Sequence, residues 1–210
     1  MKIAVIDYKM SNMFSIKNAL DFLGFDCQIT SNYKTILEAD GAVLPGVGSF
    51  PEAMQHLQDL KLADVIKEFA SGGKPFMGIC LGLQLLFSSS TEFTDCKGLN
   101  IINGKVENLS KYLPNEPVPH VGWNTVIQHK ATRNNNNSTS FLNSQLFQND
   151  HYYFVHSYFV EPANPEHVFT ETTYADFRFC SSVYVDNIFA CQFHPEKSGI
   201  RGLRILKFFF

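Results

Sequence analysis

Short apolar runs alternate with amphipathic segments along the first half of the chain. The runs are bounded by glycine, proline or polar residues, as buried strands are, and the segments between them repeat apolar residues at helical spacing. The pattern predicts strands at 2–6, near 26–29, near 42–44 and at 75–79. A helix is predicted from an N-cap at Ser11 to Leu23, before Gly24, and a loop at 45–49 is followed by a helical stretch to about Phe69 that ends at Gly72 and Gly73. Another helix is predicted directly after Cys80. Strand and helix in turn indicate a parallel sheet covered on both faces.

The second half of the chain is richer in strand signals and predicts an antiparallel, meander-like arrangement. Strands are predicted near 101–107, 121–127, 152–160, 167–174, 181–186 and 188–192. The polar run 132–139 predicts a loop insertion rather than a domain boundary. We therefore expect residues 1–210 to form a single α/β domain with a central mixed, mostly parallel sheet flanked by helices.

In such a sheet, functional sites form at the carboxyl ends of the strands. Asp7, Gly46 and Cys80 all follow a predicted strand of the first half. We expect these residues to lie near one another at one edge of the sheet.

Composition narrows the class of protein. With 210 residues, 45% of them hydrophobic and 18% charged, the chain can bury one substantial core, and a largely disordered chain is excluded. A net charge of −3 favours neither a nucleic acid nor an anionic membrane as partner. The five cysteines form no CxxC pair, which disfavours a disulfide framework or a zinc site, and no apolar run approaches the ~20 residues of a membrane span. We expect a soluble, cytoplasmic protein.

The pentapeptide Gly78-Ile79-Cys80-Leu81-Gly82 has the pattern of a nucleophile on a sharp strand-to-helix turn. Such a turn crowds the neighbouring chain, so the residues two before and two after the nucleophile must be small. The thiol would lie at a helix N-terminus, where free N–H groups favour the thiolate. The alternative is a buried core cysteine, which is the role we assign to Cys27, Cys96, Cys180 and Cys191 because they lack this setting.

A base and its orienting carboxylate are predicted in Phe193-His194-Pro195-Glu196. Proline at 195 keeps His194 extended, so side chains 194 and 196 can lie on the same side of the chain. Glu196 could then accept a hydrogen bond from one ring nitrogen and leave the other to take the thiol proton. The alternative is a surface histidine with an acidic neighbour. Among the other histidines, His156 in an aromatic strand predicts a core or cleft-lining role, and His120 has no carboxylate near it in sequence.

Three motifs together resemble the class I, or triad, glutamine amidotransferases. They are Pro45-Gly46-Val47-Gly48, Gly78-Ile79-Cys80-Leu81-Gly82-Leu83-Gln84 and Gln192-Phe193-His194-Pro195-Glu196. The resemblance implies a flavodoxin-like α/β domain without a metal or organic cofactor. It also implies a catalytic triad of Cys80, His194 and Glu196, oxyanion donors from the backbone near Gly48 and Leu81 with Val47 close by, and glutamine binding by Gln84, His156, Ser157 and Tyr158.

Within that family the chain is most similar to the glutaminase subunits of imidazole glycerol phosphate synthases. The matching residues are Ile6-Asp7-Tyr8 with Asn12, Pro119-His120-Val121-Gly122-Trp123-Asn124, the strand 153–158, and Glu196-Lys197-Ser198-Gly199. This resemblance implies a heterodimer in which ammonia passes directly to a cyclase or synthase subunit for histidine biosynthesis. The docking face would include Asn12, Trp123, Tyr153 and Lys197, with plain core packing as the alternative for Trp123 and Tyr153.

The chain departs from the family pattern in its first loop, where Lys9 and Ser11 replace the usual glycines. Because that loop faces the synthase in the family, the partner is less firmly implied than the chemistry. A paralogous glutaminase that serves amination of a surface-sugar precursor, a peptidase or amide hydrolase using the same cysteine, and an inactive interaction module stay open as alternatives. The terminal Phe208-Phe209-Phe210 must also pack somewhere in the fold.

Overall fold

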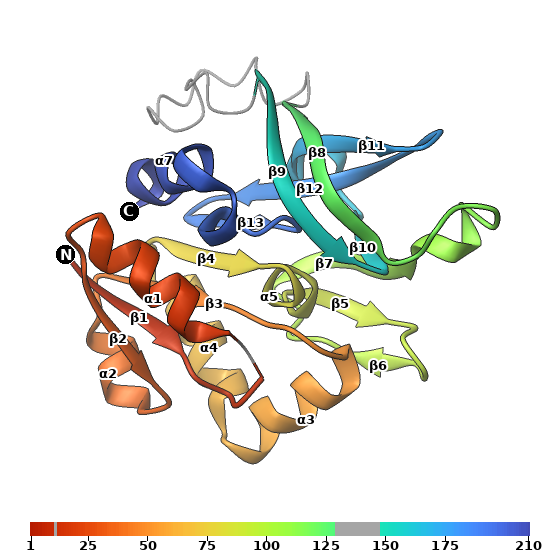
Figure 1. Cartoon of the computed structure of the whole chain (residues 1–210). Coiled ribbons are helices and arrows are strands. Elements are labelled where there is room, and N and C mark those ends of the chain that lie inside the picture. The colour runs from red at the N-terminus through yellow and green to blue at the C-terminus, as the bar shows by residue number, and fades with distance from the viewer. Residues whose placement is uncertain (11, 129–147) are drawn as a thin grey trace.

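The apolar runs of the first half lie side by side as the parallel part of one sheet (Figure 1). The computed structural model describes residues 1–10, 12–128 and 148–210. The parallel strands, in spatial order, are β2 (Asp26–Thr30), β1 (Lys2–Ile6), β3 (Gly41–Leu44), β4 (Phe76–Ile79) and β13 (Ile188–Cys191). When these five strands are numbered by their order along the chain, with β13 as the fifth, their spatial order is 2-1-3-4-5, which is that of flavodoxin-like folds, as predicted.

Helices cover both faces of the parallel strands because successive side chains of a strand point to opposite sides. On β1, Ala4 and Ile6 pack in the cluster that includes helices α2 to α5, whereas Ile3 and Val5 pack in the cluster that includes α1 and α7. The helices are α1 (Met13–Phe22), α2 (Tyr33–Glu38), α3 (Phe50–Asp59), α4 (Leu62–Ser71), α5 (Leu81–Leu85) and α7 (Gly199–Phe209).

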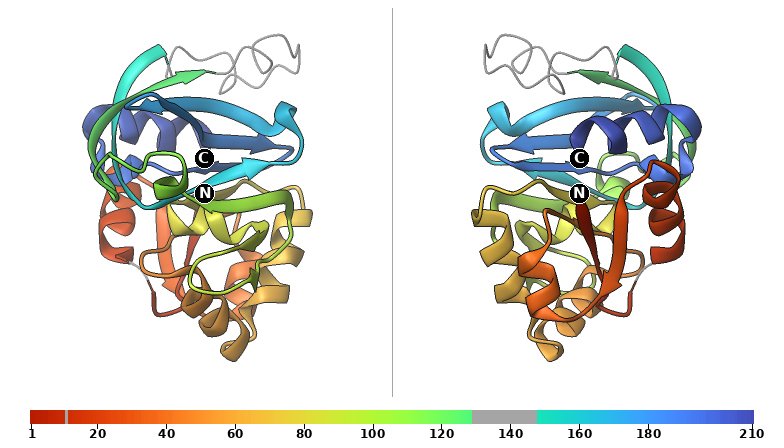
Figure 2. Two further views of the ribbon diagram at one scale, coloured as in Figure 1. Left: turned by 90° about the vertical axis from the view of Figure 1, so that its right-hand side faces the viewer. Right: turned by 90° about the vertical axis from the view of Figure 1, so that its left-hand side faces the viewer.

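The second half extends the same sheet with mostly antiparallel strands and a branch, as expected from its sequence pattern. Beyond β13 the path continues through β12 (Phe177–Val185), β10 (Tyr158–Pro162), β7 (Ile102–Asn108), β5 (Phe87–Ser90) and β6 (Cys96–Lys97). The expectation is wrong for the strand near 188–192, because β13 pairs in parallel with β4, and β7 pairs in parallel with β5. The branch consists of β11 (Val168–Tyr174), β8 (His120–Gln128) and β9 (Gln148–His156). In both views of Figure 2 this branch lies on the opposite side of the molecule from α2, α3 and α4.

Several predicted boundaries are wrong. The cap of α1 is Asn12 rather than Ser11, which lies outside the described residues, and the helix ends at Phe22 with Leu23 as its C-cap. The predicted helix before Phe69 is two helices, since Lys61 has a left-handed φ of 56° between α3 and α4. The predicted strand 152–160 is interrupted at Ser157, between β9 and β10. The polar run 132–139 lies outside the described residues.

The apolar C-terminal residues pack against the sheet as part of helix α7 and its end. The helix residues Ile205 and Leu206 are buried against the sheet. The rings of Phe209 and Phe210 continue this packing, with Phe209 5.7 Å from Phe189 and Phe210 6.2 Å from Phe25 between ring centroids. Among the residues that the structure describes, none of the helices is both long and apolar enough to span a bilayer.

Candidate active site

Cys80 occupies a strained turn between β4 and α5. Its φ of 55° and ψ of −111° lie outside the regions that most residues adopt, as expected for the predicted strand-to-helix elbow. The flanking glycines are required by close packing: a Cβ on Gly82 would lie 1.8 Å from the Leu44 carbonyl oxygen, and one on Gly78 would lie 3.0 Å from Ala190 Cβ. The elbow therefore presses against both neighbouring strands and holds the cysteine at their carboxyl ends.

His194 and Glu196 reach the same edge of the sheet because β13 is the parallel neighbour of β4. Cys191 is in register with Ile79, and the Cys80 N–H donates to the Cys191 carbonyl at 2.8 Å. Pro195 begins a short 3-10 helix, Pro195–Lys197, which turns Glu196 back toward His194. The His194 Nδ1–H donates to Glu196 Oε1 at 2.8 Å, and both side chains are less than 5% exposed. This burial contradicts the alternative of a surface histidine.

The hydrogen bond from Nδ1 determines what the rest of the His194 ring can do. With Nδ1 as donor, Nε2 is the atom left to take a proton, and within the described residues it has no hydrogen-bond partner. Burial by itself lowers the pKa of His194, but the Cys80 sulfur and the Glu196 carboxylate together outweigh it and raise the pKa to about 10. The site therefore favours an imidazolium beside Cys80.

Cys80 and His194 face one cavity of about 280 Å³. The other residues that line it are Val47, Gly48, Leu81, Gln84, Glu92, Pro119, Val155, His156, Ser157 and Tyr158. The four residues predicted to bind glutamine are among them, and so are Gly48 and Leu81, which were predicted to provide oxyanion donors. Another cavity of about 300 Å³ lies where α2 meets the β1–β2 edge, but its lining offers neither a cysteine nor a histidine.

Glu92 is a cavity residue that the sequence did not reveal. It is the one acidic side chain in the lining, and it accepts a hydrogen bond from the Phe50 N–H at 2.7 Å. Burial raises the pKa of Glu92, although the Phe50 N–H opposes this shift. Glu92 lies 42 residues from Phe50, and no motif surrounds it, so only the folded chain identifies it.

In the loop 45–49, the backbone N–H of Val47 points to the first loop and not into the cavity. The Val47 N–H donates to the Met10 carbonyl at 3.0 Å, and the next residue, Gly48, has a φ of 101° that favours glycine. On the other side, Leu81 is the first residue of α5, where a helix leaves N–H groups without an internal partner. The Leu81 backbone can therefore serve as an oxyanion donor, while the Val47 N–H is engaged by the first loop.

Polar side chains surround the cysteine on the wall formed by α5 and β13. Gln192 is fully buried, and its Nε2 lies 3.6 Å from Cys80 Sγ. Its Oε1 accepts from Gln84 Nε2 at 3.0 Å, and the same Gln84 nitrogen donates to the Tyr158 carbonyl at 3.1 Å. Both hydrogens of the Gln84 amide are thus used within the protein, and Gln84 can offer a substrate its side-chain oxygen.

A second histidine, His156, lines the cavity from β9. Its Nδ1–H donates to the Tyr158 carbonyl at 2.8 Å, and its Nε2 lies 3.0 Å from Nδ1 of His120, the residue in register with it on β8. Burial lowers the pKa of His156 to about 3 and that of His120 to about 4. Both rings are neutral at physiological pH.

Comparisons with known proteins show the family of the chain. The family model of the class I glutamine amidotransferases matches residues 4–210. The chain belongs to the class I glutamine amidotransferase family. It is 43% identical, over all of its length and 96% of the relative, to the imidazole glycerol phosphate synthase subunit HisH of Aquifex aeolicus. The HisH subunit of Listeria innocua is 45% identical over 99% of this chain and 94% of the relative.

Solved structures show the same amidotransferase fold at low identity. A crystal structure titled glutamine amidotransferase has a TM-score of 0.72 at 14% identity and covers 98% of each chain. The PurLQS structure from Thermotoga maritima gives 0.70 at 20% identity and covers 99% of this chain and 96% of that one. The predicted α/β fold class is confirmed.

The residues predicted to face a partner lie together near the amidotransferase site. Asn12 and Lys197 are exposed, and both line a small hollow behind His194 and Glu196. Trp123 is 57% exposed, which contradicts core packing for this residue, and its ring lies 6.2 Å from that of the partly buried Tyr153. Whether a partner binds at this face stays a prediction.

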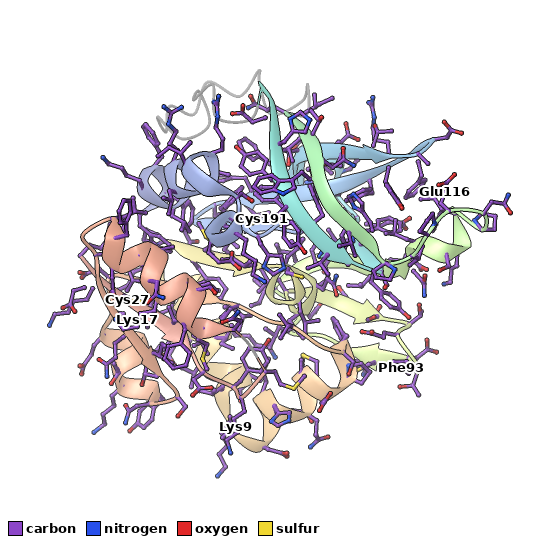
Figure 3. All side chains as sticks on the ribbon, in the orientation of Figure 1. Lys9, Lys17, Cys27, Phe93, Glu116 and Cys191 are labelled. Atoms are coloured by element: carbon purple, nitrogen blue, oxygen red, sulfur yellow. The ribbon has the colours of Figure 1, made fainter. Side chains whose placement is uncertain are left out.

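Lys9, which departs from the family pattern in the first loop, keeps the backbone conformation that glycine favours. Lys9 has a φ of 69°, in the left-handed region, and its N–H donates to Asp7 Oδ1 at 2.9 Å. The side chain of Lys9 is exposed at the edge of the molecule (Figure 3). Lysine in place of glycine therefore adds a surface charge next to Met10, whose carbonyl binds the Val47 N–H.

Proposed function

We propose that this chain is the glutaminase subunit of an imidazole glycerol phosphate synthase. It hydrolyses glutamine to glutamate and ammonia, and the ammonia passes to a cyclase partner in histidine biosynthesis. The observation that carries the chemistry is the shared cavity of Cys80 and His194, with His194 tied to Glu196 at 2.8 Å. The relatives named HisH, similar over nearly their whole length, support the choice of partner and pathway.

In the first half-reaction, the Cys80 thiolate attacks the side-chain amide carbon of glutamine. The S–C bond forms, the carbonyl oxygen takes the negative charge, and His194 gives its proton to the departing nitrogen as the C–N bond breaks. Ammonia leaves and a glutamyl thioester remains. Glu196 keeps the His194 ring in the tautomer and orientation that this transfer requires.

In the second half-reaction, water attacks the thioester with His194 as base. The new O–C bond forms, the C–S bond breaks, and the electron pair returns to the Cys80 sulfur as glutamate leaves. Each half places a negative charge on the carbonyl oxygen, and an oxyanion donor contributes about 3 kcal/mol to its stabilisation. The Leu81 N–H is one donor, and the loop containing Val47 and Gly48 is the source of the second.

Glutamine is held by groups at the other end of the cavity. Glu92 is the carboxylate of the lining and suits the α-ammonium group of the amino acid, whose positive charge would favour the ionised form of Glu92 and so oppose the effect of burial on its pKa. The segment His156 to Tyr158 and the side-chain oxygen of Gln84 complete the walls. A site that pairs a partly buried carboxylate with the α-ammonium group of its substrate selects free glutamine over a glutamine residue within a peptide.

We place this reaction in the cytoplasm. All five cysteines are free thiols, and the nucleophile requires a compartment that keeps Cys80 reduced.

The decisive experiment replaces Cys80 by serine in the complex with the cyclase partner. Glutamine-dependent product should disappear, while product formed from added ammonium salt should continue, because the second active site is intact. Cys96→Ser is the matched control, since Cys96 is partly exposed and lies outside the cavity. Full glutamine-dependent activity in Cys80→Ser rejects the assignment of the nucleophile.

Partner dependence needs a separate measurement. Since the Val47 N–H is held by the Met10 carbonyl, the isolated chain should hydrolyse glutamine slowly and accelerate when a partner repositions the first loop. Glutamate release is measured with and without the cyclase and its ligand. Equal rates would remove the link between this loop and the partner.

A further inference from the structure

Among the described residues, Gln192 contributes a buried polar side chain that contacts the sulfur of Cys80 and lies outside the Cys80–His194–Glu196 set. It follows β13 directly, has no exposed surface, and lies with its Nε2 3.6 Å from Cys80 Sγ. A buried glutamine amide costs free energy unless its hydrogen bonds are satisfied, so its position next to the sulfur is a specific feature of the fold.

The direction of the Gln192 amide follows from its neighbours. The Tyr158 carbonyl can only accept a hydrogen bond, so the Gln84 group facing it at 3.1 Å must be the NH₂. The same NH₂ then donates to the Gln192 oxygen at 3.0 Å. With its oxygen so engaged, Gln192 turns its own NH₂ toward Cys80 Sγ. The reversed arrangement would place two oxygens against each other at Tyr158.

We propose that Gln192 stabilises and orients the Cys80 thiolate through this N–H donor, with Gln84 holding the amide in the required direction. The inference rests on the proposed role of Cys80 as nucleophile. His194 exchanges a proton with the sulfur, whereas Gln192 only donates a hydrogen bond, so the two groups have different roles at the same atom.

The donor favours the charged sulfur over the covalent intermediate. A hydrogen bond to an ionised acceptor is about twice as strong as one to a neutral acceptor. Gln192 therefore stabilises the thiolate of the free enzyme and weakens its hold when the sulfur becomes part of a neutral thioester. When water attacks and the C–S bond breaks, the electron pair returns to a sulfur that already faces an N–H group. Gln192 thus assists the sulfur as leaving group in the second half-reaction.

The test is the pH dependence of Cys80 alkylation by iodoacetamide in Gln192→Met. Methionine keeps the length of the side chain and removes the N–H donor. The alkylation rate of the peptide that contains Cys80, followed by mass spectrometry, reports the thiolate at each pH. The midpoint of the profile should rise by about one pH unit, which is a tenfold loss of thiolate below the midpoint. Gln28→Met is the matched control, because Gln28 is exposed on β2 and should keep the original midpoint.

A folded Gln192→Met with an unchanged midpoint overturns the proposal. If this variant does not fold, Gln192→Asn carries the test: it keeps the amide but shortens the side chain, so the N–H cannot reach the sulfur and the midpoint should again rise. An unchanged midpoint in Gln192→Asn is equally decisive against it. Alkylation needs neither glutamine nor a partner, so its result is read separately from the glutaminase assay of Cys80→Ser, which judges the proposed function.

Discussion

His194 and His156 line the same cavity and are both buried, yet the fold gives them opposite protonation states. Each donates a hydrogen bond from Nδ1 at 2.8 Å, His194 to the Glu196 carboxylate and His156 to the Tyr158 carbonyl. The pKa of His194 is raised to about 10, whereas burial holds that of His156 at about 3. His194 has the Cys80 sulfur and the Glu196 carboxylate as neighbours, and within the described residues His156 has no such group. These neighbours, rather than burial or the number of hydrogen bonds, decide which ring can carry a proton.

His156 also belongs to a series of hydrogen bonds, from Tyr158 through His156 and His120 to Asn124, that determines the tautomer of each ring. Because His156 uses Nδ1–H for the Tyr158 carbonyl, its Nε2 must accept, and His120 must donate from Nδ1. His120 Nε2 then accepts from Asn124 Nδ2 at 3.2 Å. A proton on either ring would break one of these bonds. This side of the cavity shapes the substrate site, and the proton transfers fall to His194.

The largest effect should come from removing one of the two groups that raise the pKa of His194, the Glu196 carboxylate. Glu196→Gln keeps the shape of the side chain but takes away the carboxylate, so the pKa of His194 falls and its ring loses the favoured tautomer. We expect kcat for glutamate release in the complex to fall on the order of 100-fold to 10,000-fold. Steady-state kinetics with glutamine measures this loss.

Glu166→Gln is the control for that substitution, since Glu166 is exposed on the 3-10 helix Pro165–His167. It should leave kcat unchanged. A value of kcat in Glu196→Gln within twofold of the unmodified protein would mean that the carboxylate does not govern His194.

A smaller effect is expected on stability at acid pH, from the neutral pair. The folded pKa of His120, about 4, lies below the value of about 6.5 in an unfolded chain. Below pH 6.5 the unfolded state therefore binds more protons, and the free energy of unfolding falls as the pH drops toward 4. In His120→Phe the loss between pH 6.5 and 4 should be smaller by about 2 kcal/mol.

Urea unfolding at several pH values measures this difference. His56→Phe is the control, because His56 is only partly buried on α3, and it should keep the full acid slope. If His120→Phe and the unmodified protein lose the same free energy over this range, the neutral pair is not the source of the acid sensitivity.

The two histidine environments differ in how far the sequence predicts them. His194 and Glu196 are two residues apart and joined by a proline, so short-range geometry was enough to place these two side chains together. The glycines around Cys80 marked its turn, but the meeting of Cys80 with His194 depends on the pairing of β4 with β13, and only the family resemblance implied it. The contact of His120 with His156 comes from the register of β8 with β9, which are separated by residues 129–147. No local pattern encodes that register, so the sequence predicted a cleft-lining role for His156 but no partner for it.

The same distinction applies to the rest of the fold. The apolar runs predicted the four parallel strands of the first half, β1 to β4, because buried strands need only a short continuous run, but they placed β13 in the antiparallel part. They did not predict Glu92 in the cavity or the break at Lys61, since the first depends on long-range packing and the second on a single left-handed residue. Gln192 was part of a recognised motif, but its contact with Cys80 became visible only when β4 and β13 were neighbours.

The smallest effect should follow from removing Asn124, the last hydrogen-bond donor in the series that links His156 and His120. Asn124 donates from Nδ2 to His120 Nε2 and, at 3.0 Å, to the Thr173 carbonyl, so Asn124→Ala leaves two acceptors without this donor. We expect the free energy of unfolding at pH 7.5 to fall by about 1 kcal/mol, measured by urea unfolding. The exposed Asn115→Ala should show no such loss. Because His156 stays buried, its ring should stay neutral, and NMR titration of His156 should show no protonation above pH 5. A His156 that titrates near pH 6.5 in this variant would show that Asn124, and not burial, keeps this side of the cavity uncharged.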